Sequence, residues 1–275
     1  MNSSLAFQLY SEENHFLYEL IQNADDLDYG GETPALDLDL YQGPSPRLEI
    51  QSNELGFSHE NVEAICAAGQ STKLGKPGTI GEKGIGFKSV FRIAHKAWIC
   101  SRFYSFALDT ATPGMGAFGM VIPTWVPNDA AVAQDAGSII TLYLRSRPEE
   151  NSLLERFKNF DFTFLLFCRR LKRIQFRLVY SDNKEEIRKA EWINPNLQQT
   201  ILPSARGLEE TCYFIHKSKI LQMPQEAKRP GVGDTDVSLA FPYNKNGAVV
   251  QSQATFAFLP IRHYGFDVRL PAQFS

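Results

Sequence analysis

Two short stretches of this sequence carry side chains whose types and spacing could do chemistry. The first is ELIQNADD, residues 19–26, in which a carboxylate and a carboxamide stand four residues apart and Asp26 follows three places later. On a helix these three positions fall on one face. Asn23 can offer Mg²⁺ a hard oxygen ligand, and Glu19 can take a proton from water as a general base. The same spacing also suits the solvated polar face of an ordinary surface helix.

The second stretch is GEKGIGFKS, residues 81–89, a glycine-rich turn that runs into a predicted helix. Glycines at such a turn let backbone N–H groups approach an anion, and the helix N-terminus favours phosphate. The order G-x-x-G-x-G differs from the dinucleotide-binding order G-x-G-x-x-G, and Phe87 stands where a P-loop has its lysine. A flexible loop closing onto a helix is the alternative. The candidate phosphate-contacting residues of the turn are Gly81, Gly84, Ile85, Gly86 and Phe87.

Two further segments lie between these stretches. NELGF, residues 53–57, follows a predicted strand and opens a helix. GQSTK, residues 69–73, begins a loop rich in Gly, Lys, Ser and Thr that ends at the glycine turn. Such a loop, with its hydroxyls and a lysine at Ser71, Thr72 and Lys73, could serve as a lid that shields phosphates from bulk water.

The predicted elements that position these groups mix helices and strands. Apolar residues at helical spacing predict a helix over residues 12–27 that begins at Ser11, and Ser58 is expected to cap a second helix. Alternating residues 36–41 and a run at 48–51 predict a β-hairpin. A third helix is expected over 85–94, two short strands over 98–108, and strands over 115–122 and 139–144.

The chain changes character near residue 148, where we place a domain boundary. Phenylalanines crowd a predicted helical stretch from residue 153 to 167, which runs into the basic cluster at 169–173. This cluster is expected to be the basic end of a core helix, with RNA binding as the less favoured alternative. Strands are expected at 174–180, 210–217, 237–242 and 254–259.

Composition narrows the function classes. The chain has 275 residues, 43% of them hydrophobic, and a net charge of −3, so no strong field draws it to nucleic acid or a membrane surface. No apolar run approaches the ~20 residues of a membrane-spanning helix. The four cysteines, none of them in a C-x-x-C pair, suit a reducing cytoplasmic or nuclear compartment.

Taken in order, the motifs resemble those of the GHKL superfamily: gyrase, the heat-shock chaperone ATPase, histidine kinases and MutL. The resemblance is strongest to its sacsin-like branch, which carries E-L-I-Q-N-A-D-D, N-E-x-G-F and G-x-x-G-x-G-F-K-S-V-F in this order, and it covers about residues 10–145. It implies the Bergerat fold: an α/β (α+β) two-layer sandwich of a mixed, mostly antiparallel sheet with helices on one face. Residues 1–148 would form the ATP-binding domain, and residues 149–275 a partial transducer-like segment.

The resemblance also implies roles. Glu19 would be the base that activates water, Asn23 the Mg²⁺ ligand, and Asp26 a residue that lines the ATP pocket. Gly56 would close against adenine, and Ser138 in G-S-I-I would be the hydroxyl that helps an acidic residue hold the base. The lid would start at Ser71, Thr72 and Lys73 and hinge at the glycine turn.

The sequence departs from the pattern at the acid that reads adenine. Counting back from Gly56, its position falls on Ser52, which carries no charge, and Asn53 is the substitute if the strand register shifts. No clear counterpart of the phosphate-sensing arginine is visible. We expect a chaperone-like ATPase with slow Mg²⁺-dependent hydrolysis and a protein client or self-association. The alternative is a nucleotide-binding or interaction module without hydrolysis.

Overall fold

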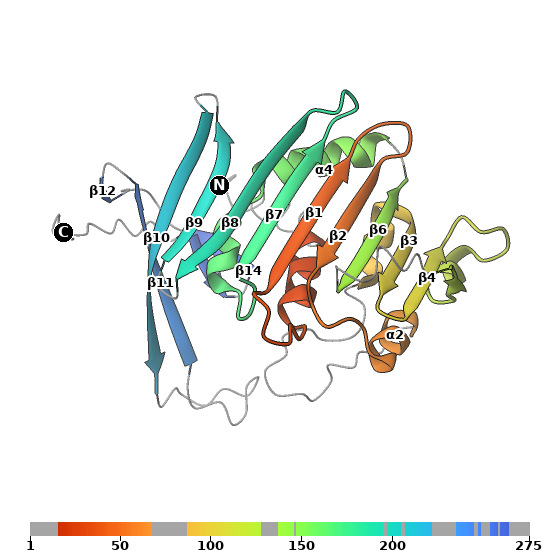
Figure 1. Cartoon of the computed structure of the whole chain (residues 1–275), viewed down its shortest axis with the longest axis horizontal. Helices are drawn as coiled ribbons and strands as arrows, with labels where there is room; N and C mark the ends of the chain where they lie inside the picture. The colour runs from red at the N-terminus through yellow and green to blue at the C-terminus, as the bar shows by residue number, and fades with distance from the viewer. Residues whose placement is uncertain are drawn as a thin grey trace. The chain divides into compact units, whose positions relative to one another are not determined.

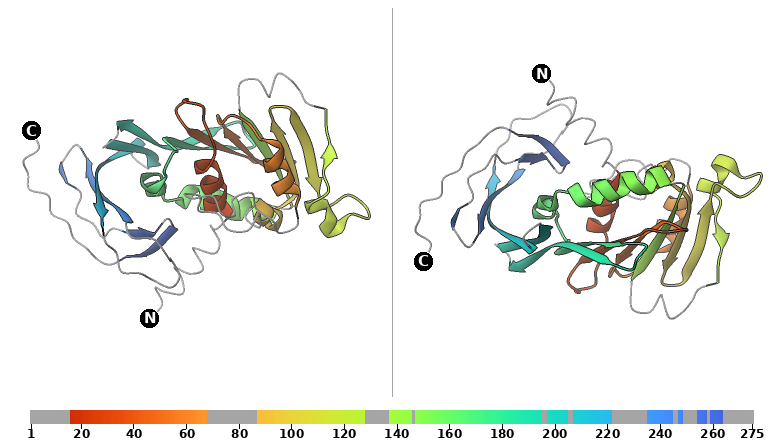
Figure 2. Two further views of the ribbon diagram at one scale, coloured as in Figure 1. Left: turned by 90° about the horizontal axis from the view of Figure 1, so that it is seen from below. Right: turned by 90° about the horizontal axis from the view of Figure 1, so that it is seen from above.

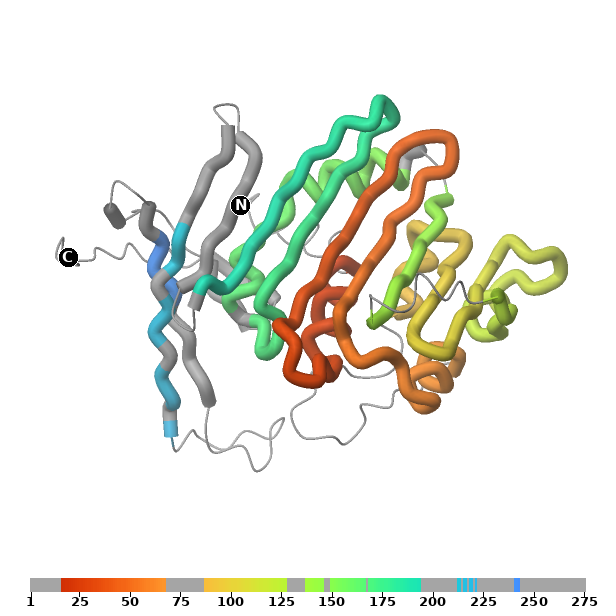
Figure 3. The backbone as a smooth tube through the Cα atoms, in the orientation of Figure 1, coloured from red at the N-terminus to blue at the C-terminus, as the bar shows by residue number. Residues whose placement is uncertain are grey.

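The computed structural model describes most of the chain (Figure 3). The described residues are 16–67, 87–127, 137–145, 147–194, 197–204, 207–221, 235–244, 247–248, 254–257 and 259–263. The chain divides into two compact units, each continued after a short excursion into the other. The first consists of Met1–Asp161 and Cys168–Lys189, and the second of Phe162–Phe167 and Ala190–Ser275.

The first unit, which includes β8 as far as Lys189, is built on a mixed sheet with the strand order β8-β7-β1-β2-β6-β3-β4-β5 (Figure 1). β1 and β7 pair in parallel, whereas β1–β2, β2–β6, β6–β3, β3–β4 and β4–β5 are antiparallel. The strands are β1 (Ala35–Tyr41), β2 (Arg47–Ser52), β3 (Ala94–Ser101), β4 (Tyr104–Asp109), β5 (Thr124–Trp125), β6 (Ser138–Leu144), β7 (Arg173–Val179) and β8 (Glu185–Asn194). An α+β fold with a large mixed sheet is therefore confirmed.

Helices are few among the described residues. The first helix spans residues 16–25 of the described chain, and it lies with α4 on one face of the sheet (Figure 2). The other helices in the described part of this unit are α2 (His59–Cys66), α4 (Arg147–Asn159), and the 3-10 helices η1 (Phe87–Arg92) and η2 (Gly116–Met120).

The predicted hairpin is confirmed as β1–β2, and its alternation determines which face is buried. Leu36, Leu38 and Leu40 are fully buried under the helices. Asp37 and Asp39, which point to the opposite face, form ion pairs with arginines of β7, at 2.7 Å and 2.5 Å. Period-2 patterning thus sets both the strand and its orientation.

Aromatic packing fixes the first helix over the sheet. The ring of Phe160, just after α4, lies 4.7 Å from that of Phe176 on β7 and 5.4 Å from that of Tyr18 on the first helix. Phe157 on α4 lies 4.5 Å from Phe176. The aromatic crowding seen in the sequence therefore forms core and holds the first helix at a fixed height above the strands.

Three predicted elements are wrong in type or extent. The helical stretch predicted from residue 153 into the basic cluster at 169–173 ends at Asn159, and the cluster is not the end of a helix, because residues 168–172 are not helical and β7 begins at Arg173.

Residues 85–94 were expected to form one helix, but the described part is the short η1, and β3 already begins at Ala94. Residues 115–122 were expected to form a strand and instead contain η2. For residues 115–122 the physical reason lies in two glycines. Gly116 adopts a positive φ of 48°, and Gly119 packs so closely on the backbone of Asp109 that a side chain would collide.

The second unit contains the strand order β12-β11-β10-β9 and a separate hairpin, β13–β14. The bounds are β9 (Leu197–Ser204), β10 (Gly207–Ile220), β11 (Thr235–Asn244), β12 (Gly247–Ala248), β13 (Ala254–Ala257) and β14 (Leu259–His263). The 3-10 helix η3 (Phe162–Phe167) belongs to this unit, where Leu166 packs against Tyr213 and Ile215 of β10. Strands were predicted within β10, β11 and the β13–β14 hairpin, whereas β8 and β9 were not predicted.

Candidate functional site

Three partly exposed side chains form a line along the first helix. Within residues 16–26, every side chain is buried except those of Glu19, Asn23 and Asp26, which are partly exposed. These are the three residues singled out by the i, i+4, i+7 spacing, so the structure places them together as predicted. A surface helix would expose a broad polar face. This helix instead exposes a narrow strip of oxygen-bearing side chains.

Asp25, next to this line, has a different environment. Its carboxylate is 1% exposed and accepts backbone N–H bonds from Arg169, Arg170 and Leu171 at 2.7–2.8 Å. It therefore fixes the end of the first helix to the chain that enters β7. Asp25 positions the line without belonging to it.

The turn after the first helix reaches the end of β2. The Tyr29 hydroxyl donates to the carbonyl of Ala24 at 2.9 Å and lies 3.3 Å from Oγ of Ser52. Burial raises the pKa of Tyr29, which therefore stays a protonated donor. Asn53 is engaged elsewhere: its side chain accepts from the Ala35 amide at 2.8 Å and donates to the Thr33 carbonyl at 2.9 Å. Ser52 and Asn53 thus have structural partners.

Three buried serines form a row across the ends of neighbouring strands. Strand register pairs Ser52 of β2 with Ser138 of β6, and Ser138 with Ser101 of β3. The hydroxyls of Ser138 and Ser101 lie 2.5 Å apart, and Ser101 also accepts from the amide of Phe57 at 2.7 Å. We refer to these three residues as the serine row. It joins the predicted G-S-I-I strand to the N-E-L-G-F segment.

A buried carboxylate covers the serine row. Glu54 is 4% exposed; its Oε1 accepts from the hydroxyl of Ser138, and its Oε2 accepts from the amide of Gly56 at 2.5 Å. Burial raises the pKa of Glu54, although both hydrogen bonds and the charge of Arg102 oppose this. Sequence reasoning missed Glu54, because counting back from Gly56 selected Ser52. The signal available was the acid two residues before the glycine.

Two glycines permit this close packing. Gly56 has a φ of 90°, and a Cβ there would collide with the side chain of Arg102. At Gly137, just before β6, a Cβ would collide with the backbone carbonyl of Glu54. The segments that carry Glu54 and Ser138 can therefore meet only if residue 137 lacks a side chain, and Gly56 leaves room for the side chain of Arg102.

The segment after the glycine turn is anchored by Lys88. Its ammonium donates to the carbonyl of Ile65 in α2 and, at 2.5 Å, to that of Met120 in η2. Burial lowers the pKa of Lys88. This lysine therefore binds the ends of two helices and does not have the free ammonium that a P-loop lysine offers to phosphates. Phe87, the first residue of η1, is half-buried.

The rest of the predicted lid lies outside the described residues. This holds for seven of the candidate site residues: Ser71, Thr72, Lys73, Gly81, Gly84, Ile85 and Gly86.

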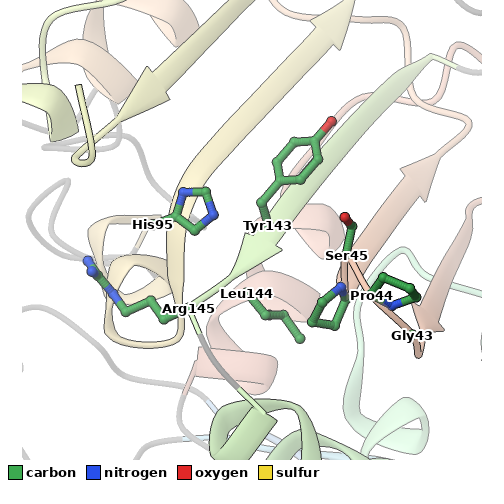
Figure 4. A pocket seen from close by; sticks show the side chains of 8 residues that line it. Gly43, Pro44, Ser45, His95, Tyr143, Leu144 and Arg145 are labelled. Carbon is green, nitrogen blue, oxygen red and sulfur yellow. The ribbon is translucent and has the colours of Figure 1, made fainter.

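A cavity of about 460 Å³ lies at the other end of the same strands (Figure 4). It is lined by the β1–β2 turn and by residues where β3 begins and β6 ends: Gly43, Pro44, Ser45, Pro46, His95, Tyr143, Leu144 and Arg145. The guanidinium of Arg145 already donates to the carbonyl of Phe91, at 3.1 Å and 3.2 Å. This cavity is separate from the serine row, because each strand places the two at opposite ends.

The described ranges hold no group of three or more His, Cys, Asp or Glu side chains arranged around a metal position. In the same ranges no helix is both long and apolar enough to cross a membrane.

Comparison with known proteins adds a family relationship. Residues 6–111 match the family described as the Sacsin domain. The chain is 33% identical to Protein NO VEIN of Arabidopsis thaliana over 295 aligned residues, which cover 98% of the chain and 10% of that protein. It is 26% identical to Sacsin of Homo sapiens over 231 residues, which cover 65% of the chain and 5% of Sacsin. These similarities support a sacsin-like family, and the chain spans a tenth or less of the relatives' length.

Proposed function

We propose that this chain is a GHKL-type module with a Bergerat fold that binds Mg·ATP and hydrolyses it slowly. The observation that carries the proposal is the partly exposed line of Glu19, Asn23 and Asp26 on an otherwise buried helix. Through Tyr29, the turn after this helix contacts the strand end that leads to Glu54. One side of such a site would hold metal and water, and the other the nucleobase.

The residues on the line suit Mg²⁺ chemistry. Mg²⁺ is usually held by one or two protein oxygens together with waters and substrate phosphates, so it needs no cluster of protein ligands. Asn23 would supply the amide oxygen, and Asp26 would line the same edge. When bound, the metal would neutralise charge on the phosphates.

Glu19 is the proposed general base. It lies one helical turn before Asn23 on the same line, where it could orient and deprotonate the water that attacks the γ-phosphate. The lid from Ser71 to Phe87 would cover the phosphates with backbone amides. A protein client or self-association of the module remains part of this proposal.

For the nucleobase we propose Glu54 in place of Ser52. The resemblance implies an acidic residue that holds adenine with the help of the hydroxyl at Ser138. In this chain the carboxylate in contact with the Ser138 hydroxyl is that of Glu54, whereas Ser52 is hydrogen-bonded to Tyr29. An ionised Glu54 can accept a hydrogen bond from the amine of adenine. The charge thought to be missing at Ser52 would thus be supplied two residues later.

The test pairs calorimetric binding of Mg·AMPPNP with phosphate release from ATP. Glu19→Ala should lower phosphate release by about 100-fold or more and spare binding, since general bases contribute at least this factor. Asn23→Ala should weaken Mg·AMPPNP binding by about tenfold or more. Glu32→Ala, an exposed acid beyond the line, serves as the matched control and should change neither.

Each outcome separates the alternatives. Binding of Mg·AMPPNP by the wild-type chain without phosphate release would favour a nucleotide-binding module that does not hydrolyse. Equal turnover in Glu19→Ala and the wild type would remove Glu19 as the base. Absence of binding by the wild-type chain would contradict the proposal as a whole.

A further inference from the structure

Arg102 lies in an unusual backbone position beside the proposed nucleobase site. It follows Ser101 in the short turn between β3 and β4, and its φ of 50° is in the left-handed region. Few residues other than glycine adopt this conformation, and those that do so often lie at functional sites. Here it carries the Arg102 side chain across Gly56, where Cγ and Cδ occupy the space that a Cβ would need.

This placement puts a cation beside Glu54. The Glu54 carboxylate accepts hydrogen bonds from the hydroxyl of Ser138 and the amide of Gly56. The side chain of Arg102 lies across that same Gly56, and its positive charge acts on the carboxylate. Tyr29 is also close enough to feel the charge of Glu54, and it stays neutral. Arg102 is therefore the cation that acts on this buried carboxylate among the described residues.

The charge of Glu54 decides which base the site accepts. An ionised carboxylate only accepts hydrogen bonds, so it suits the 6-amino group of adenine and repels the 6-oxo group of guanine. A protonated carboxyl group can donate, so it tolerates the 6-oxo group. Burial favours the protonated form, and the charge of Arg102 favours the ionised form.

We propose that Arg102 is a positioning and specificity-determining residue, which acts through Glu54 to make the site prefer adenine over guanine. This inference rests on the proposed function. Arg102 has two roles: its aliphatic stem holds the Gly56 turn in place, and its guanidinium keeps Glu54 as a pure acceptor.

Two variants separate these roles. Arg102→Met keeps a stem that can cover Gly56 and removes the charge, whereas Arg102→Lys keeps both. Arg47→Met is the control, since it removes an arginine charge that acts on a different carboxylate, Glu49, at the opposite end of β2. Thermal unfolding of all three shows whether each variant folds.

The experiment measures binding of non-hydrolysable ATP and GTP analogues from about pH 5.5 to about pH 8.5. In Arg102→Met the affinity for the ATP analogue should fall at a higher pH as the pH is lowered. The preference for ATP over GTP at neutral pH should drop about two- to fivefold, the range expected for the loss of an exposed charge near a carboxylate. Arg102→Lys and Arg47→Met should follow the wild type. A merely structural role would lower affinity equally at every pH.

A second readout does not depend on nucleotide. In protein with ¹³C-labelled glutamate, the NMR titration of the Glu54 carboxyl should move to higher pH in Arg102→Met. Unchanged titration together with an unchanged ATP preference would overturn the inference while leaving the proposed function intact. Absence of nucleotide binding by the wild type would instead overturn the proposed function and the specificity role, and the titration would still decide whether Arg102 holds Glu54 ionised.

Discussion

The two ends of β2, β6 and β3 differ in how their polar groups are held. At one end the three serines and Glu54 are buried, and the hydroxyls of Ser101 and Ser138, the Glu54 carboxylate and the amides of Gly56 and Phe57 are joined by hydrogen bonds. At the other end, about 20 Å away along strands of six to eight residues, Ser45 and Arg145 are exposed around an open cavity.

This difference shows that a cavity and a buried hydrogen-bond network can lie at opposite ends of the same strands. The cavity end has the measurable volume, but its turn contains Gly43, around which a Cβ would meet nothing. The serine-row end demands glycine at two positions and buries a carboxylate. Buried, mutually satisfied polar groups are costly to assemble and rigid once formed, so substitutions at the serine-row end should change stability more than substitutions at the cavity end.

The greatest change in the free energy of unfolding should come from a steric clash, which we test by substituting one glycine from each end. Gly137→Ala should lower the free energy of unfolding by about 3 kcal/mol or more, because the new methyl group collides with the Glu54 carbonyl. Gly43→Ala should cost only about 1 kcal/mol, from its φ of 137°. Urea unfolding of both variants measures the difference. Equal losses would mean that the two ends are equally permissive.

A smaller effect is expected for one serine from each end. Ser138→Ala should lower the free energy of unfolding by about 1–3 kcal/mol, because it removes the hydroxyl that donates to the buried Glu54 carboxylate. Ser45→Ala, at an exposed turn, should stay within about 0.5 kcal/mol. Urea unfolding at neutral pH measures the free energy of unfolding of both serine variants. A neutral Ser138→Ala would show that Glu54 does not depend on this donor.

The smallest effect concerns pH. Burial raises the pKa of Glu54 above its ordinary value of 4.5, so the folded state binds the proton more tightly than the unfolded state. The free energy of unfolding should therefore decrease as pH rises above about 4.5, and the decrease ends once pH exceeds the folded-state pKa. In Glu54→Gln, whose side chain cannot ionise, the free energy of unfolding should lack this decrease with pH.

Urea unfolding of the wild type and of Glu54→Gln from about pH 4 to about pH 8 gives the free energy of unfolding of each as a function of pH. The difference between the two curves is the contribution of Glu54 ionisation. If the two curves run parallel across this range, the pKa of Glu54 is not raised in the folded protein.

Local patterns predicted much of the fold. Period-2 alternation predicted β1–β2, and Ser58 was correctly expected to cap α2, where its hydroxyl accepts from the amide of Asn61 at 3.3 Å. Helical spacing predicted the line of Glu19, Asn23 and Asp26. These features depend on neighbours within a few residues, so sequence alone suffices for them.

Features that depend on distant pairing were missed. Glu54 and Ser138 are 84 residues apart, and Asp25 and Arg169 are 144 apart. Ser52 and Ser138 were named from the sequence, but not their alignment with Ser101 in one row, because the row arises only when β6 lies between β2 and β3 in one register. β8 was missed since its many charged residues obscure the strand pattern, and η2 because its glycines fold an apolar run into a turn.

We propose that the line on the first helix and the Glu54 end of the strands are two sides of one nucleotide site. A crystal structure of the chain soaked with Mg·AMPPNP is the decisive measurement. We expect metal density beside Asn23 and the adenine amine within hydrogen-bond distance of Glu54. Nucleotide bound instead in the cavity between Ser45 and Arg145, with the Glu54 end unchanged, would contradict it.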